Sequence, residues 1–231
     1  KEGKRILMGG QMPYKGLQGE RASSWTAEFD LEKGALTNYT VDGKQLILEP
    51  VAPCFARAVT ENDLGSNFDK LMAIWRDSDI VPSTVDYEEL DDCSRVTVVS
   101  EPLGEAAVVI MEYRIYADGE ISVTESLKDA GKLALAPIMP RYGIQLAMPG
   151  EYSCVEFFGK GPFENYVDRQ SAALVGHYRQ RVEDQYHYGY VRPQESGTKT
   201  GLKWLRVTDE NGTGLEIISD RKFSGSALPF S

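Results

Sequence analysis

Apolar and polar residues alternate along much of the chain, and this period of two predicts β-strands rather than helices. Apolar side chains recur at alternate positions within residues 109–115, and Ile121, Val123 and Leu127 continue the same spacing. The pair Asp118-Gly119 separates the two runs. Because Asp-Gly readily forms the tight turn of a hairpin, this stretch predicts two antiparallel strands.

A second hairpin is predicted near the end of the chain. Residues 202–207 and 215–218 have strand-like patterns and flank a loop, 209–214, that is rich in residues tolerant of positive φ. Residues 29–36 follow the order strand, turn, strand. Further strands are predicted at residues 45–48, 96–99, 142–147 and 154–158. These elements predict a mostly antiparallel, all-β fold.

One segment has a helical period instead. The apolar residues within 68–75 are spaced at i, i+3, i+4 and i+7, and Ser66 or Asn67 can serve as the N-cap. This spacing predicts a single short amphipathic helix that packs on the sheets. Since no linker rich in Pro, Gly or Ser divides residues 1–231, we expect a single domain.

Composition and charge exclude several classes of function. Hydrophobic residues make up 42% of the 231 and charged residues 26%, which supports a folded core. The net charge of −10 disfavours nucleic acid as a partner, because that interaction requires clustered Lys and Arg. No apolar run approaches the ~20 residues that a membrane helix needs, so no membrane contact is expected.

The cysteines and the first residue of the chain leave the cellular compartment of the protein undecided. Cys54, Cys93 and Cys154 lack the close pairs of structural zinc sites, and we interpret them as buried thiols. A disulfide between two of them is an open alternative, so the redox compartment is undecided. Because the chain starts at Lys1 rather than Met, we expect it to be a piece of a longer protein.

Residues 159–169, GKGPFENYVDR, contain a dense polar cluster. They lack the third glycine and the following helix of a dinucleotide-binding loop, so Gly-x-Gly-Pro indicates a turn after a strand. Glu164, Asn165, Asp168 and Arg169 follow this turn. Such side chains either bind sugar hydroxyls or form an internal ion-pair network. Composition favours the network, because half-buried acids need partners.

A second polar stretch, residues 192–197, follows an aromatic run at residues 186–190. Sugar sites combine aromatic faces with carboxylates and amides, although tyrosines packed between two sheets are the simpler explanation. Two histidines, His177 and His187, lie in no pattern that requires catalysis and are interpreted as structural.

A third polar stretch, residues 55–65, contains the triplet Glu61, Asn62 and Asp63. These side chains are of the kind that ligate metals, but one such triplet is a weak signal and does not complete a calcium-binding loop. Capping of the loop is the preferred interpretation.

The order and wording of these stretches resemble a known family. The matching phrases are FARAVTENDLG (55–65), GPFENYVDR (161–169), YVRPQESGTKTGLKWL (190–205) and FSGSALPFS (223–231). They resemble the C-terminal small-chain domain, domain 5, of glycoside hydrolase family 2 β-galactosidases of the large, enterobacterial lactose-cleaving type. The resemblance extends from the region of Phe29 to the end of the chain.

The resemblance implies an antiparallel β-supersandwich like that of galactose mutarotases, truncated at its C-terminal end and cut from a larger chain. It also implies that both catalytic carboxylates of a retaining glycosidase lie on a TIM barrel elsewhere in the polypeptide, with any Mg and Na sites. No catalytic residue, cofactor or metal ligand is therefore expected in this chain. The residues implied to line or support the concave face are Arg57, Asn62, Asp63, Glu164, Asn165, Tyr166, Asp168, Arg169 and Glu195.

Three functions compete on this basis. The leading one is an accessory domain for the assembly and active-site rim of a β-galactosidase, whose partners are the other domains of its polypeptide, galactosides and further copies of the protein. The second is a free-standing aldose 1-epimerase with Glu195 as base, but no histidine lies within the matched phrases. The third is a galactose-binding module that uses Tyr166, Tyr188 and Tyr190 as platforms.

Overall fold

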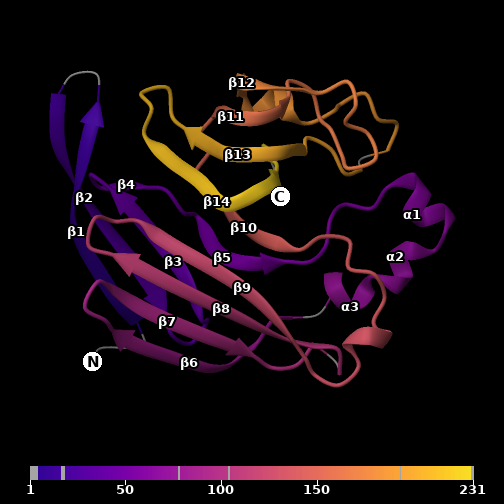
Figure 1. Cartoon of the computed structure of the whole chain (residues 1–231), viewed down its shortest axis with the longest axis horizontal. Helices are drawn as coiled ribbons and strands as arrows, with labels where there is room; N and C mark the ends of the chain where they lie inside the picture. Colours follow the sequence, from indigo (N-terminus) through magenta and orange to yellow (C-terminus); the bar gives the residue numbers. More distant parts are fainter. Residues whose placement is uncertain (1–4, 17–18, 78, 104, 193, 230–231) are drawn as a thin grey trace. The chain divides into compact units, whose positions relative to one another are not determined.

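A computed structural model describes residues 5–16, 19–77, 79–103, 105–192 and 194–229. Pro193, Phe230 and Ser231, which belong to the matched phrases, lie outside these ranges. The chain divides into two compact units: unit 1 comprises residues 1–57 and 62–147, and unit 2 comprises residues 58–61 and 148–231. Strands dominate both units, and the sheets in the described residues are antiparallel (Figure 1). The predicted all-β class is confirmed.

Unit 1 contains three antiparallel sheets within the described residues (Figure 1). One sheet has the order β1 (Arg5–Gly16), β2 (Gly19–Asp30), β3 (Ala35–Val41) and β4 (Lys44–Gln45). Another has the order β6 (Pro82–Glu89), β7 (Cys93–Ser100), β8 (Ala107–Tyr116) and β9 (Ile121–Asp129). The third pairs β5 (Glu49–Cys54) with β10 (Gly143–Ala147).

The Asp118-Gly119 hairpin is confirmed and also joins two sheets of unit 1. Strands β8 and β9 pair on either side of this turn, in which Gly119 has a φ of +88°. A Cβ at Gly119 would lie 3.0 Å from ring atoms of Trp25 on β2, so only glycine meets both requirements. The hydroxyl of Tyr39 on β3 donates to the Gly119 carbonyl at 2.9 Å. Nearby, the rings of Phe29 and Tyr113 pack edge to face with centroids 5.0 Å apart.

Unit 2 contains one described sheet, in the order β12 (Leu174–Arg181), β11 (Cys154–Gly161), β13 (Lys199–Thr208) and β14 (Gly214–Gly225). Strands β13 and β14 confirm the second predicted hairpin. The side chain of Asp209 caps its loop by accepting the N–H groups of Asn211 and Thr213, both at 2.9 Å. The core of the unit is a buried cluster of Val155, Phe157, Leu202 and Leu205.

The remaining strand predictions hold with one exception. As predicted, β7 contains residues 96–99 and β11 contains residues 154–158, while β10 covers residues 143–147. Residues 29–36 run from the end of β2 through a turn to the start of β3. The prediction at 45–48 is wrong, because β4 ends at Gln45. Leu46 and Ile47 are both buried, and consecutive buried side chains cannot lie on one face of a strand. Their segment instead passes through the core, with the Leu46 N–H donating to the Tyr39 carbonyl at 2.8 Å.

The prediction of one helix is also wrong. The described residues form three short helices instead, α1 (Glu61–Gly65), α2 (Phe68–Leu71) and α3 (Ala73–Arg76), and two short 3₁₀ segments, η1 (Leu133–Leu135) and η2 (Val182–Gln185). Asn67 occupies the N-cap position of α2 as predicted, but its φ of 56° is left-handed and its side chain makes no capping hydrogen bond. Met72 is not helical and separates α2 from α3. Trp75 is buried and its indole donates to the Pro137 carbonyl at 2.9 Å.

The cysteines are free thiols, two buried and Cys54 half-buried, which corrects the disulfide alternative. Across the described ranges, no helix combines the length and apolar character needed to cross a bilayer.

Candidate functional site

The nine predicted site residues divide between the two units. Arg57, Asn62 and Asp63 belong to unit 1, and the other six belong to unit 2. Within unit 2 the six lie on two loops. One loop, 162–173, connects β11 to β12, and the other, 186–198, leads into β13. That all nine line one concave face stays a prediction.

The two loops of unit 2 are joined close to the sheet. The backbone N–H of Asn165 donates to the Thr198 carbonyl at 2.8 Å. Loop 162–173 starts at the end of β11, where Gly161 allows close packing, because a Cβ there would lie 3.0 Å from the ring of Phe157 and 2.9 Å from that of Tyr178. The chain leaves β11 after Gly161 as predicted, although Gly159 and Lys160 lie within the strand rather than in the turn.

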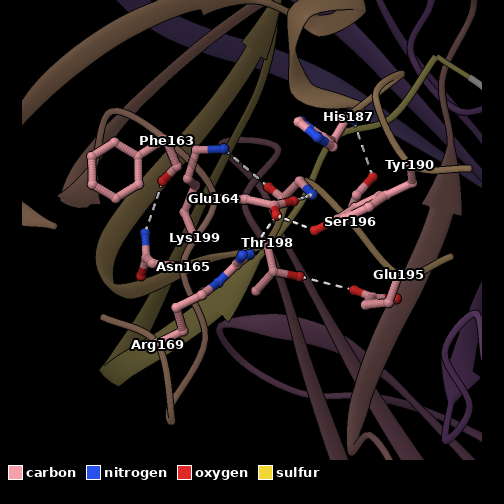
Figure 2. A network of polar contacts seen from close by, with 11 residues as sticks. Phe163, Glu164, Asn165, Arg169, His187, Tyr190, Glu195, Ser196, Thr198 and Lys199 are labelled. Atoms are coloured by element: carbon pink, nitrogen blue, oxygen red, sulfur yellow. Dashed lines mark hydrogen bonds and ion pairs between the residues drawn. The ribbon is translucent and has the colours of Figure 1, made fainter. Parts of the chain in front are cut away.

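Glu164 is the centre of the polar network between the loops (Figure 2). One carboxylate oxygen, Oε1, accepts the Tyr190 hydroxyl at 2.8 Å and a guanidinium N–H of Arg169. The other, Oε2, accepts the backbone N–H of Gly197 at 2.9 Å. The Glu164 side chain is 15% exposed, so these protein donors take the place of water.

The network keeps Glu164 ionised. Burial by itself raises the pKa of this carboxyl, but the three donors outweigh burial and hold the pKa below its ordinary value. The same ion pair, together with its hydrogen bonds, raises the pKa of the Arg169 guanidinium. Glu164 is therefore a poor proton donor near neutral pH.

We expect a Glu164→Gln variant to lose about 1–2 kcal/mol of unfolding free energy at neutral pH, because the amide is neutral and its nitrogen cannot accept, so at least one of the three donors loses its acceptor. A lowered carboxyl pKa stabilises the fold above the unfolded pKa, and this stability is lost as pH falls through the folded pKa. The deficit should therefore shrink below about pH 4. Urea titrations across pH test this, with the exposed Glu151→Gln as control. A deficit that is constant down to acid pH would contradict the assignment.

Asn165 is completely buried and uses its whole side chain for hydrogen bonds. Its amide nitrogen donates to the carbonyls of Lys160 and Phe163 at 3.0 and 3.1 Å. Its amide oxygen accepts the N–H and hydroxyl of Thr200 at 3.0 and 2.5 Å. Asn165 therefore has no free donor or acceptor for a ligand and acts as a structural link between the loop and β13.

Of the remaining four predicted residues of unit 2, Tyr166, Arg169 and Glu195 contact the network or its loops. The Tyr166 ring lies 5.4 Å from the Arg169 guanidinium, and burial raises the pKa of its hydroxyl. Glu195 accepts the Thr198 hydroxyl at 3.0 Å. Asp168 is exposed at the tip of the loop, apart from the Glu164 network. The internal network that composition favoured is thus present, and Asp168 does not belong to it.

Lys199 is a member of the network that the sequence did not reveal. It is the first residue of β13 and only 4% exposed, and its ammonium donates to Gln185 Oε1 at 2.9 Å and to the Gly197 carbonyl at 3.1 Å. Burial lowers the pKa of Lys199 to about 8, opposed by the nearby Glu164 charge. A lysine at the start of a strand is normally solvated, so no local signal predicts this burial.

The aromatic run lies in loop 186–198 rather than in a strand, and its rings are half-buried or exposed rather than enclosed between sheets. Tyr186 and Tyr188 pack edge to face with centroids 4.9 Å apart, and His187 and Tyr190 do so at 4.4 Å. Tyr188 remains 68% exposed. The loop therefore presents one open aromatic ring beside a fixed polar network.

In unit 1, Arg57 and Asp63 form a bidentate ion pair. The two guanidinium nitrogens lie 2.6 and 3.0 Å from the two carboxylate oxygens, and the side chains are 22% and 9% exposed. Asn62 is exposed, and its backbone carbonyl accepts the Ser66 hydroxyl at 2.8 Å. Asp63 thus faces Arg57, and the described residues contain no cluster of potential metal ligands. Glu61, Asn62 and Asp63 lie in helix α1 rather than in a loop, so their capping role stays a prediction.

Comparison with known proteins gives the family. A model of the β-galactosidase small-chain family matches residues 21–231. The chain is 30% identical to a β-galactosidase of Priestia megaterium over 211 residues, covering 90% of this chain and 20% of that protein. A β-galactosidase of Photobacterium profundum is 31% identical over 219 residues, which cover 87% of this chain and 21% of that protein. The chain thus spans about a fifth of the length of the curated relatives it matches. Because the family model covers most of its residues, the chain belongs to the β-galactosidase small-chain family.

Proposed function

We propose that this chain is an accessory domain of a β-galactosidase, the C-terminal small-chain domain of the large, enterobacterial type. Its family and the names of its relatives support this proposal. Hydrolysis of terminal β-galactosides with retention needs two carboxylates about 5–5.5 Å apart that can exchange protons with substrate. We propose that both belong to parts of the polypeptide beyond this chain, together with any metal sites, and that the full-length protein is a homo-oligomer.

The observation that carries the accessory role is that protein groups bond both carboxylate oxygens of Glu164 and every donor and acceptor of the Asn165 amide. Tyr190, Arg169 and Gly197 occupy the carboxylate, and backbone and Thr200 groups occupy the amide. Groups that already bond protein partners in this way are poorly placed to bind substrate, and the lowered pKa of Glu164 disfavours proton donation. Their role is instead to hold loops 162–173 and 186–198 in one arrangement. We propose that these loops shape the rim of an active site whose chemistry lies in other domains.

Hydrolysis assays test this proposal directly. The purified chain is expected to show no turnover of o-nitrophenyl β-galactoside above buffer, with the full-length Priestia megaterium relative as the positive control. Turnover that survives repurification, and is lost in a Glu164→Gln or Glu195→Gln variant, would overturn the proposal.

A galactose-binding module is the second candidate, and the exposed Tyr188 ring supports it. Tyr186 holds this ring from one side, which leaves a flat aromatic surface for the C–H face of a sugar. Calorimetric titration with galactose at millimolar concentration distinguishes the candidates. Saturable binding that Tyr188→Ala abolishes would favour the module, whereas a flat titration favours the accessory role. A polarimeter trace of α-galactose that the protein leaves unchanged would exclude an epimerase.

A further inference from the structure

Glu125 interrupts the apolar inner face of a sheet in unit 1. On β9 it pairs with Met111 of β8, and the next pair on the same face is Tyr113 with Val123. Side chains directly opposite in antiparallel strands lie on one face of the sheet. Met111 and Tyr113 are 3% and 1% exposed, and Val98 of β7, which pairs with Met111, is 6% exposed. Glu125 therefore lies at a position where the alternation along β9 predicts an apolar residue.

The carboxylate of Glu125 has no partner in the described residues. Both of its oxygens are buried and accept no hydrogen bond. Two hydroxyls face the same region, but each donates elsewhere: Tyr113 to the Val51 carbonyl of β5 at 3.4 Å, and Tyr142 to the backbone carbonyl of Glu125 at 2.7 Å. An ionised carboxylate in such a site pays its desolvation cost without compensation.

The proton on Glu125 is accordingly held more tightly than in water. Burial raises the pKa of this carboxyl to about 7, and no described charged side chain opposes the effect. The facing tyrosines also have raised pKa values, because they are buried and close to this carboxylate, so neither titrates near neutral pH. Val123 and Leu127, its neighbours along this face of β9, do not titrate. Glu125 is then the group on this face that changes charge near neutrality.

A chain of contacts leads from Glu125 to the loop that carries Arg57 and Asp63. Tyr142, which bonds the Glu125 carbonyl, stacks on Phe55 with ring centroids 6.0 Å apart and planes inclined by 14°. Phe55 packs edge to face on Trp75 of α3 at 6.2 Å. Phe55 is also the first residue of the 55–65 segment. The Tyr142 hydrogen bond and two aromatic contacts thus connect β9 at Glu125 with this segment.

We propose that Glu125 is a proton-linked switch in unit 1, in which the neutral carboxyl keeps β9, Tyr142 and residues 55–57 and 62–76 packed and its ionisation loosens them. The direction of the pH effect follows from the difference between the folded and unfolded pKa values of Glu125. The folded pKa of about 7 lies above the ordinary value of 4.5, so the stabilising effect is complete below about pH 4.5 and is lost as pH rises through 7. The switch concerns the packing of unit 1 and does not depend on the accessory role proposed above.

Hydrogen exchange of the intact chain, measured separately for each peptide, tests the switch. Protection factors, corrected for intrinsic exchange, are compared between about pH 5.5 and pH 8. In the wild type we expect the protection factors of residues 55–57 and 62–76 to fall about tenfold, after allowance for the partial exposure of Glu125. Peptides from 154–181 in unit 2 should change much less. In Glu125→Gln, which imitates the neutral acid, the loss should disappear.

The matched control is Glu112→Gln on the outer face of β8. Glu112 pairs with Thr124, next to Glu125 on β9, and its carboxylate bonds Arg114 at 2.8 Å. This variant should keep the wild-type loss of protection. Equal pH dependence in wild type and Glu125→Gln, or equal loss in both units, would overturn the proposal.

An infrared titration of the wild type provides a second test that does not rely on any variant folding. A buried carboxyl band should disappear as pH rises through about 7. If every carboxyl band titrates below about pH 5, Glu125 is not the proposed switch.

Discussion

An Asn165→Ala variant is expected to have an unfolding free energy about 3–5 kcal/mol lower than that of the wild type, because several buried groups lose their partners at once. The Thr200 N–H would lose its acceptor, and the carbonyls of Lys160 and Phe163 would lose a donor. The contact also spans 35 residues, so no local turn replaces it. Urea unfolding of wild type and variant, followed by fluorescence, gives the difference in free energy.

The matched control is Asn211→Ala in the exposed β13–β14 loop. Its side chain is solvated, and the change should cost about 0.5 kcal/mol or less. Similar losses in the two variants would show that Asn165 does not link loop 162–173 to β13. A large loss confined to Asn165→Ala would support the structural role on which the accessory function depends.

Removal of either partner of the Arg57–Asp63 ion pair is expected to lower the unfolding free energy by about 2–4 kcal/mol, because the other charge stays largely buried without its bidentate partner. The double variant should cost less than the sum of the two single variants. Thermal or urea unfolding of Arg57→Ala, Asp63→Ala and the double variant gives a coupling of about 2 kcal/mol.

The exposed pair Arg76 and Asp77 is the natural control, since it has the same bidentate chemistry with N–O distances of 2.6 and 2.8 Å. Its side chains are 37% and 56% exposed, so solvent screens the charges. Arg76→Ala should change stability by about 0.5 kcal/mol or less. Equal effects at the two pairs would mean that burial does not decide the strength of the Arg57 contact.

The hairpins and the internal network could be predicted from the sequence because both have short-range signals. Asp118-Gly119 between alternating runs specifies a turn, and the polar density of residues 159–169 indicates that acids there need partners. The helix was mispredicted because Met72 satisfies the apolar spacing without taking helical angles. Trp75 is held by a bond to Pro137, a contact that no helical period contains.

The sequence alone determined the all-β class, the principal hairpins, the turn that follows β11 and the family, since each depends on residues close together or on phrases in a fixed order. Only the tertiary structure decided which polar residues are buried. Asn165, Lys199 and Glu125 lie at positions where local patterns predict solvent or a strand face, and their burial depends on distant segments. Burial is a property of the whole packed unit, and therefore hydrogen bonding and pKa are decided there as well.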